Sequence, residues 1–352
     1  MSQADYNQEL TPEVREKMRK NLIYVGIFSV MMLFAGLTSG YIVSAGDAFW
    51  VKYNFPPAFY ISTALIILSS IVLGIGIKVA QKKGNPSILK TIVPVTFILG
   101  LGFAYFQFKG YQELAANGAF LSSKITVSEG RYGDYYELEV HGKYMEVDGN
   151  DYLIADKLVS DQQKKEISAF AKQFEAISKT KNPQIANLDD YGILYKHQRV
   201  SLKDGKFYVQ DTVELTHVDL IRLEEFSWHL RDGRGDFFHK GKFGKDFKVF
   251  YKKKELEYKD RTLMYKGVPL NAPLQLKLDS SPDTATSYLY ILTVLHLLHI
   301  LVSIIFLFKA SIRSFSGKLA ADNFLPIRTL AIFWHFLGVL WIFLLLFLLF
   351  YH

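Results

Sequence analysis

The sequence contains no cysteine among its 352 residues. This absence excludes disulfide bonds, thiolate metal sites, iron–sulfur clusters and cysteine nucleophiles. Any metal or haem would therefore depend on histidine, methionine or carboxylate ligands. Charged residues are also few, at 21%, whereas 50% of the residues are hydrophobic. This composition indicates that apolar and polar residues lie in separate blocks, as in an integral membrane protein with a water-soluble domain.

The formal charge of +7 raises the question of an anionic partner. Because the Lys and Arg residues near the apolar runs fall in loops, they suit anionic lipid better than nucleic acid. We therefore expect a membrane and no nucleic acid as partner.

Five apolar runs are long enough to cross a bilayer, which takes about 20 residues in a helix. They cover about 22–45, 57–80, 91–108, 286–309 and 328–351. The fold class that we predict is an all-α polytopic membrane bundle of five transmembrane helices with an inserted α+β soluble domain. Its parts are an N-terminal segment at 1–21, helices at 22–112, the insertion at 113–284 and two last helices at 285–352.

The orientation follows from the positive charge of the short loops, which stays on the cytoplasmic side. With five spans, the N-terminus, the second loop and the last loop lie on the same side of the membrane, and all three are flanked by basic residues. These residues are Arg15, Lys17, Arg19, Lys20, Lys78, Lys82, Lys83, Lys90, Lys309, Arg313, Lys318 and Arg328. We predict a cytoplasmic N-terminus, with the insertion and the C-terminus on the exoplasmic side.

The insertion alternates strand and helix patterns. Residues 124–159 alternate in the manner of strands, with Asp148-Gly149-Asn150 as a turn. A helix follows, capped by Ser160 or Asp161, and its apolar face holds Ile167, Phe170, Phe174 and Ile177. Asp204-Gly205 predicts a second hairpin, and residues 218–230 a second helix. An α+β fold of this size buries its own core.

The charges of the insertion are unevenly placed, with many carboxylates before residue 200 and many lysines at 240–266. These are either ordinary solvated faces or a surface that steers a charged partner. The histidines of the insertion have spacings that fit no compact metal motif, and we interpret them as scattered surface residues: His141, His197, His217, His229 and His239.

Two histidines, His296 and His299, lie three residues apart in the fourth span and so near one helical face. Such a pair binds haem iron or a metal, relays protons, or hydrogen-bonds a neighbouring helix or lipid. Haem ligation would need a histidine on a second helix at the same depth in the membrane. His335 in the last span differs in depth from His296 and His299 by a distance on the order of 10 Å along the membrane normal. We favour a structural or lipid contact.

Several motifs in the spans carry a family resemblance. They are Trp334-His335-Phe336 with Trp341, the His296 and His299 helix, Pro56-Pro57 followed by Thr63 and Ser69-Ser70, Phe34-Ala35-Gly36-Leu37 with Tyr41, and Gln107 with Tyr111. Taken in order, they resemble subunit III of the haem-copper cytochrome c oxidases in its bacterial five-span form. The insertion lies outside the resemblance.

The resemblance implies a subunit that carries no catalytic centre or cofactor of its own and belongs to a proton-pumping terminal oxidase of the bacterial inner membrane. Haem and copper would reside in the partner subunits I and II, and this chain would stabilise subunit I and hold phospholipid near the oxygen path. The residues implied at lipid or subunit interfaces are His296, His299, Trp334, His335, Phe336, Trp341, Tyr111, Gln107, Pro56, Pro57, Thr63, Ser69 and Ser70. We further expect the insertion to dock cytochrome c or another respiratory complex.

The sequence departs from the family pattern at three carboxylate positions, where Val30, Gly110 and Gly338 stand instead. Ser62 also replaces an Asn. Because buried carboxylates in lipid usually mark function, these departures argue against local proton buffering and leave the scaffold and lipid roles.

Two other classes are compatible with the pattern. One is a membrane anchor subunit that binds haem b or quinone through the histidines. The other is a membrane-tethered solute-binding protein or a transporter, for which Pro94 and the glycines of the third span would mark a broken helix.

Overall fold

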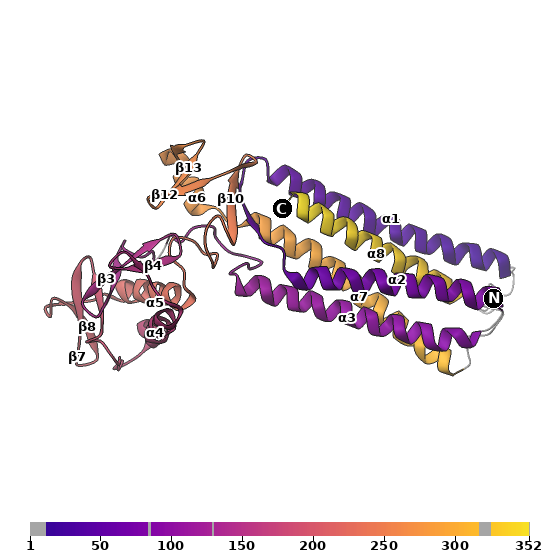
Figure 1. Cartoon of the computed structure of the whole chain (residues 1–352), viewed down its shortest axis with the longest axis horizontal. Helices are drawn as coiled ribbons and strands as arrows, with labels where there is room; N and C mark the ends of the chain where they lie inside the picture. The colour runs from indigo at the N-terminus through magenta and orange to yellow at the C-terminus, as the bar shows by residue number, and fades with distance from the viewer. Residues whose placement is uncertain (1–11, 84–85, 129, 317–324, 352) are drawn as a thin grey trace, which may run out of the picture. The chain divides into compact units, whose positions relative to one another are not determined.

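The computed structural model describes residues 12–83, 86–128, 130–316 and 325–351. The chain divides into two compact units (Figure 1). The first contains Met1–Ser44, Phe55–Ala115 and Ser287–His352, and the second contains Ala45–Asn54 and Ala116–Thr286. The chain therefore passes between the units at four points.

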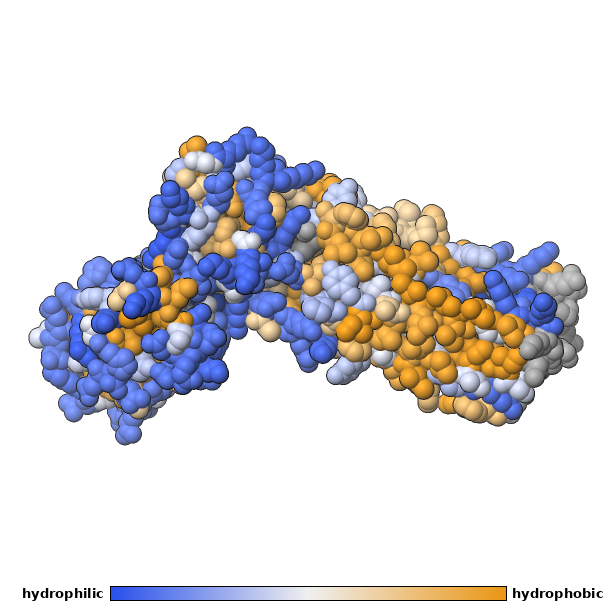
Figure 2. All heavy atoms as spheres, viewed as in Figure 1, coloured by the Kyte–Doolittle hydropathy of each residue, from blue (hydrophilic) through white to orange (hydrophobic). Residues whose placement is uncertain are grey.

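The first unit is a bundle of five helices that are long and apolar enough to cross a membrane. They are α1 (Pro12–Ser44), α2 (Pro57–Lys83), α3 (Leu89–Ala116), α7 (Thr284–Phe315) and α8 (Leu325–Tyr351), with a short 3₁₀ turn, η2 (Pro86–Ile88), before α3. This confirms the predicted number of spans. The helices are longer than the apolar runs, since each extends past the bilayer-length segment. Figure 2 shows an apolar surface along this bundle.

The third span continues through Pro94 as one helix of 28 residues. A proline inside a helix removes one hydrogen-bond donor and usually kinks the helix or ends it. Here the helix is unbroken from Leu89 to Ala116, so the broken-helix sign of a transporter is not found in this span.

The second unit is built from three copies of one motif, in which four strand positions are followed by a helix. The first copy contains β2 (Tyr136–Val140), β3 (Lys143–Asp148), β4 (Asp151–Ile154), β5 (Lys157–Leu158) and α4 (Asp161–Ala171). The second contains β6 (Tyr191–Tyr195), β7 (Gln198–Lys203), β8 (Lys206–Val209), β9 (Val213–Glu214) and α5 (His217–Asp232). The third contains β10 (Phe247–Tyr251), β11 (Lys254–Glu255), β12 (Glu257–Lys259), β13 (Thr262–Tyr265), β14 (Val268–Pro269) and α6 (Ala272–Ser280).

The repeat is visible in the helix starts and in the turns. The side chains of Ser160, Thr216 and Asn271 cap the three helices, and these positions are 56 and 55 residues apart. The turn between the first two strands of each copy has two residues with positive φ, and these are His141-Gly142, Lys196-His197 and Lys252-Lys253. Such turns match the twist of the strands that they join. In the third copy the second strand is divided into β11 and β12.

The first two copies share one eight-stranded antiparallel sheet in the order β5-β4-β3-β2-β6-β7-β8-β9. Their first strands pair with each other, and Leu138 lies opposite Ile193. These two residues occupy the same position in their repeats, so the pairing has a local two-fold axis. The helices α4 and α5 cover one face, where the predicted face with Ile167, Phe170, Phe174 and Ile177 joins the core. The last two lie in 3₁₀ turns, η3 (Lys172–Phe174) and η4 (Ile177–Lys179).

The third copy has no fourth copy to pair with, and a strand from outside the insertion takes that place. This strand is β1 (Phe49–Tyr53), from the loop between α1 and α2, and it pairs antiparallel with β10. Val51 lies opposite Val249, the residue that corresponds to Leu138 and Ile193. The two strands read Phe-Trp-Val-Lys-Tyr and Phe-Lys-Val-Phe-Tyr, which share three identical positions. β1 was not predicted from the sequence.

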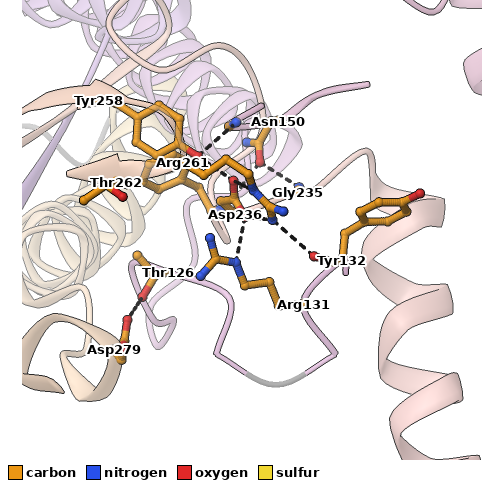
Figure 3. A network of polar contacts seen from close by, with 12 residues as sticks. Thr126, Arg131, Tyr132, Asn150, Gly235, Asp236, Tyr258, Arg261, Thr262 and Asp279 are labelled. Atoms are coloured by element: carbon orange, nitrogen blue, oxygen red, sulfur yellow. Dashed lines mark hydrogen bonds and ion pairs between the residues drawn. The ribbon is translucent and has the colours of Figure 1, made fainter. Parts of the chain in front are cut away.

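A buried carboxylate fastens the third copy to the first (Figure 3). Asp236, which is 4% exposed, accepts hydrogen bonds from Arg131 Nε at 2.8 Å and Arg261 Nε at 3.0 Å. Tyr258 also donates to it. Burial alone would raise the pKa of Asp236, but the hydrogen bond from Arg261 and the charge of Arg131 outweigh burial and lower it. Asn150, in the turn after β3, accepts from Gly235 N at 2.8 Å and joins the first copy to the segment between α5 and β10.

Candidate functional site

The candidate site is a seam in the bundle where α8 packs on α2, α3 and α7. Trp334 and Trp341 are both fully buried there. Trp341 Nε1 donates to Thr63 Oγ1 at 2.8 Å, and Trp334 Nε1 donates to Ser69 Oγ at 3.0 Å. Each hydroxyl also donates to a carbonyl of its own helix, 2.7 Å from Thr63 to Phe59 and 2.8 Å from Ser69 to Ile66. The indole groups are thereby satisfied without water, as an apolar environment requires.

The three histidines of the predicted site have different surroundings. His296 is fully buried, and its ring lies 5.2 Å from that of Trp341. Its Nε2 is 3.0 Å from the carbonyl oxygen of Leu337 on α8. His299 is half-buried, with Nδ1 2.7 Å from the carbonyl of Leu295 and its ring 6.0 Å from Phe34 of α1. His335 is half-buried and lies beside Gly74 of α2.

The structure therefore brings His296 to Trp341 and directs His299 and His335 to other helices. Among the residues that the structure describes, no group of three or more His, Asp or Glu side chains is arranged to hold a metal ion. In the insertion, His229 and His239 are buried, in contrast to the predicted scattered surface positions, because each packs against aromatic rings.

The remaining predicted site residues lie on α2, α3 and α8, or directly before α2. Gln107 is fully buried and donates to Ser62 Oγ at 2.8 Å, which joins α3 to α2. Tyr111 packs against Phe59 at 5.8 Å and Tyr290 at 5.6 Å between ring centroids. Pro57 is the first residue of α2 and is exposed, whereas Pro56 before it is buried. Ser70 and Phe336 are half-buried.

The missing carboxylates have physical explanations at two positions. A Cβ atom at Gly110 would lie 2.3 Å from the ring of Phe59, so the aromatic ring occupies the space that a side chain would need. A Cβ atom at Gly338 would lie 3.1 Å from Ser70 Oγ. One turn after Gly110, Glu113 approaches the start of α2, where Ala58 N donates to its carboxylate at 3.4 Å. A negative charge is stabilised at a helix N-terminus. Sequence reasoning missed the partners Phe59, Ser62 and Glu113.

An apolar cavity of about 490 Å³ lies between α1, α7 and α8. Apolar side chains dominate its lining, which includes Ile23, Phe306 and Phe333. Lys309 and Arg313, two of the basic residues used above to predict orientation, also line it. An apolar cavity that is also lined by two cationic side chains has the chemistry to hold an acyl chain and an anionic headgroup.

These observations define the class of the protein, a five-span membrane protein with an inserted extramembrane α+β domain and an intramembrane Trp-His seam. The family model for cytochrome c oxidase subunit III matches residues 279–352. This segment, 74 of the 352 residues, contains all of α7 and α8, and the match is consistent with a subunit of this type. The first three spans and nearly all of the insertion lie outside the match. No curated protein and no solved structure matches the chain.

Proposed function

We propose that the chain is the non-redox subunit III of a proton-pumping haem-copper cytochrome c oxidase, packed against subunit I in the bacterial inner membrane. The observation that carries the proposal is the family match over α7 and α8, the helices that supply His296, Trp334 and Trp341 to the seam. Because the indole groups of Trp334 and Trp341 find their hydrogen-bond partners within the chain, the exposed apolar faces of the bundle are left for lipid and partner subunits. The basic loops support a cytoplasmic N-terminus, with the insertion on the opposite side.

The direct test compares cells with and without the chain. If it stabilises subunit I, membranes of the deletion strain contain less assembled haem-copper oxidase, and the full-length chain restores the amount. Unchanged oxidase content and activity after deletion would contradict the proposal. Trp341→Ala is a second variant for this test, because it removes the contacts of Trp341 in the seam and leaves the insertion unchanged.

The lipid role that we propose is supported by the cavity between α1, α7 and α8. Lys309 and Arg313 would hold an anionic phosphate, while the apolar lining holds an acyl chain. The double variant Lys309→Gln/Arg313→Gln should lose a co-purifying anionic phospholipid, measured by native mass spectrometry. The matched control is Lys82→Gln, an exposed lysine of α2, which should keep the lipid. Equal lipid content in all three proteins would refute this assignment.

We also propose that the insertion docks an electron donor such as cytochrome c or another respiratory complex. Part of the predicted charge separation is neutralised internally, since Lys242 pairs with Asp151 at 3.0 Å and Lys248 with Glu255 at 2.9 Å. The support that remains comes from Glu139 and Glu146, on the sheet face opposite to α4 and α5. Glu146 is exposed, and each of the two glutamates stands between two core residues of its strand, so its side chain lies on the other face of the sheet.

Charge reversal tests the docking. Glu139→Lys/Glu146→Lys should raise the KM for a basic electron donor at low ionic strength, and the difference should vanish at high salt. Glu166→Lys, at an exposed position of α4, reverses one charge on the opposite side of the sheet and should have little effect. The same KM in all variants, together with unchanged migration of larger assemblies, would rule out docking at this face.

A further inference from the structure

A group of buried polar side chains gathers at the start of α7, within the second unit. His239 and Asp283 are both fully buried, and His239 Nε2 lies 3.7 Å from Asp283 Oδ2. The Tyr53 ring of β1 meets the His239 ring edge-on at 5.0 Å between centroids. Asp283 N donates to the carbonyl of Ser123 at 2.8 Å, and Asp283 Oδ1 accepts from Thr286 N at 3.1 Å. Four separate segments therefore meet at this point.

Several of these groups have unmet hydrogen-bonding capacity. Within the described part of the chain, the hydroxyls of Tyr53 and Ser123 and both ring nitrogens of His239 are buried without a protein partner. Leaving a buried polar group unpaired costs about 1–3 kcal/mol, so native proteins rarely leave several together. A neutral imidazole offers one donor and one acceptor, and each hydroxyl offers both. These are the partners that a buried water molecule uses, since it typically makes about three hydrogen bonds.

We propose that Tyr53, Ser123, His239 and Asp283 enclose an internal site for ordered water. The water joins β1, the segment after α3, the segment between α5 and β10 and the start of α7 through hydrogen bonds. The 3.7 Å between His239 Nε2 and Asp283 Oδ2 is too long for a direct hydrogen bond and allows one water oxygen to contact both.

The side chains around the pair favour water over a metal ion. Burial lowers the pKa of His239 to about 3 and raises the pKa of Asp283 to about 7, so burial opposes a charge on either group. The groups that face the pair are Tyr53 from β1, Ser123 from the segment after α3, Phe247 from β10 and Thr286 from α7. None of these is a strong metal ligand, whereas metal sites in proteins usually have three or four.

Radiolytic hydroxyl labelling of the full-length protein tests the proposal, because it modifies buried side chains that lie beside ordered water. The control is Tyr251, which is 7% exposed and buried like Tyr53, which is 9% exposed. We expect Tyr53 to be modified several-fold faster than Tyr251. Equal rates would overturn the proposal.

A structure that resolves ordered water gives the second measurement, and it does not depend on a variant. The expected result is water density within about 3.2 Å of Tyr53 Oη and of a ring nitrogen of His239. A peak at about 2.0–2.2 Å from both His239 and Asp283 would indicate a metal ion and contradict the proposal, as would an empty site. Asp283→Asn keeps the size and the helix cap, so it should retain the water, whereas Tyr53→Phe should reduce its occupancy.

Discussion

The pairing of β1 with β10 lets us predict how much stability is lost when a buried aromatic side chain of β1 is truncated. Phe49, in β1, is fully buried, and its ring stacks on Tyr251 of β10 at 4.7 Å between centroids. Truncating a buried Phe to Ala costs about 3–5 kcal/mol, which is a large share of the roughly 5–15 kcal/mol that stabilises a whole domain. Phe49→Ala should therefore separate β1 from β10 without changing either span.

Hydrogen exchange measures that separation directly. When exchange depends on the equilibrium of local opening, a loss of about 3 kcal/mol of local stability raises the exchange rate of the amides that the pairing protects by roughly 100-fold. We expect this increase in β10, at Phe247–Tyr251, and little change in β2 and β6, which pair with each other. The control is Tyr144→Ala, an aromatic truncation at a side chain that is 54% exposed in β3. If β10 exchanges no faster in Phe49→Ala than in the control, β1 does not hold the third repeat.

Three further results are expected. Asp236→Asn leaves the guanidinium groups of Arg131 and Arg261 without their carboxylate, and because these are 30% and 35% exposed, the loss should be near the lower end of about 3–5 kcal/mol in urea unfolding of the insertion. Since the pKa of Asp236 is lowered on folding, its contribution to stability is present above about pH 4 and is lost as the pH falls through the folded pKa. If unfolding of Asp236→Asn is as sensitive to acid as unfolding of the unchanged protein, Asp236 does not make this contribution. Trp341→Phe removes the hydrogen bond to Thr63 and part of the buried indole, so in detergent it should cost more than the about 0.6 kcal/mol of one hydrogen bond within a membrane but less than Trp341→Ala, and equal losses in the two variants would contradict this order. Gly110→Glu should destabilise the bundle by about 1–3 kcal/mol through its clash with Phe59, with partial recovery in combination with Phe59→Ala, and an unchanged melting temperature would refute that explanation.

The spans were predictable because apolar length alone identifies a membrane helix. The cap at Ser160, the hairpins at Asp148-Gly149 and Asp204-Gly205, and the helix near residues 218–230 were also predicted correctly. Each of these features depends on local chemistry, because a capping side chain or a turn residue interacts with residues close to it in the sequence.

The repeat and β1 were missed for different reasons. The repeat preserves turn and cap positions with little identity between copies, so it is visible only when the spacings of 56 and 55 residues between Ser160, Thr216 and Asn271 are compared. The strand β1 has five residues in a short loop, and its partner lies about 200 residues further along the chain. Pairing over such a separation leaves no periodic signal, although the shared Phe-x-Val-x-Tyr pattern of β1 and β10 would have suggested it.

The sequence singled out several side chains of the seam but not their partners. The Trp, His and Gln side chains stood out because polar groups in an apolar run need partners. Phe59 did not stand out, since a phenylalanine is common in a span, and Ser62 was noted only as the replacement of an Asn. The separate directions of His296, His299 and His335 depend on how the helices pack, which sequence spacing does not determine.

The most direct test of the central claim is to purify the tagged full-length chain from its native membranes in mild detergent and record the optical spectrum, the metal content and the co-purifying subunits. The account predicts a haem- and copper-bearing subunit I in stoichiometric amount with this chain. A colourless protein that purifies alone, under conditions in which haem-copper oxidases remain intact, would contradict it.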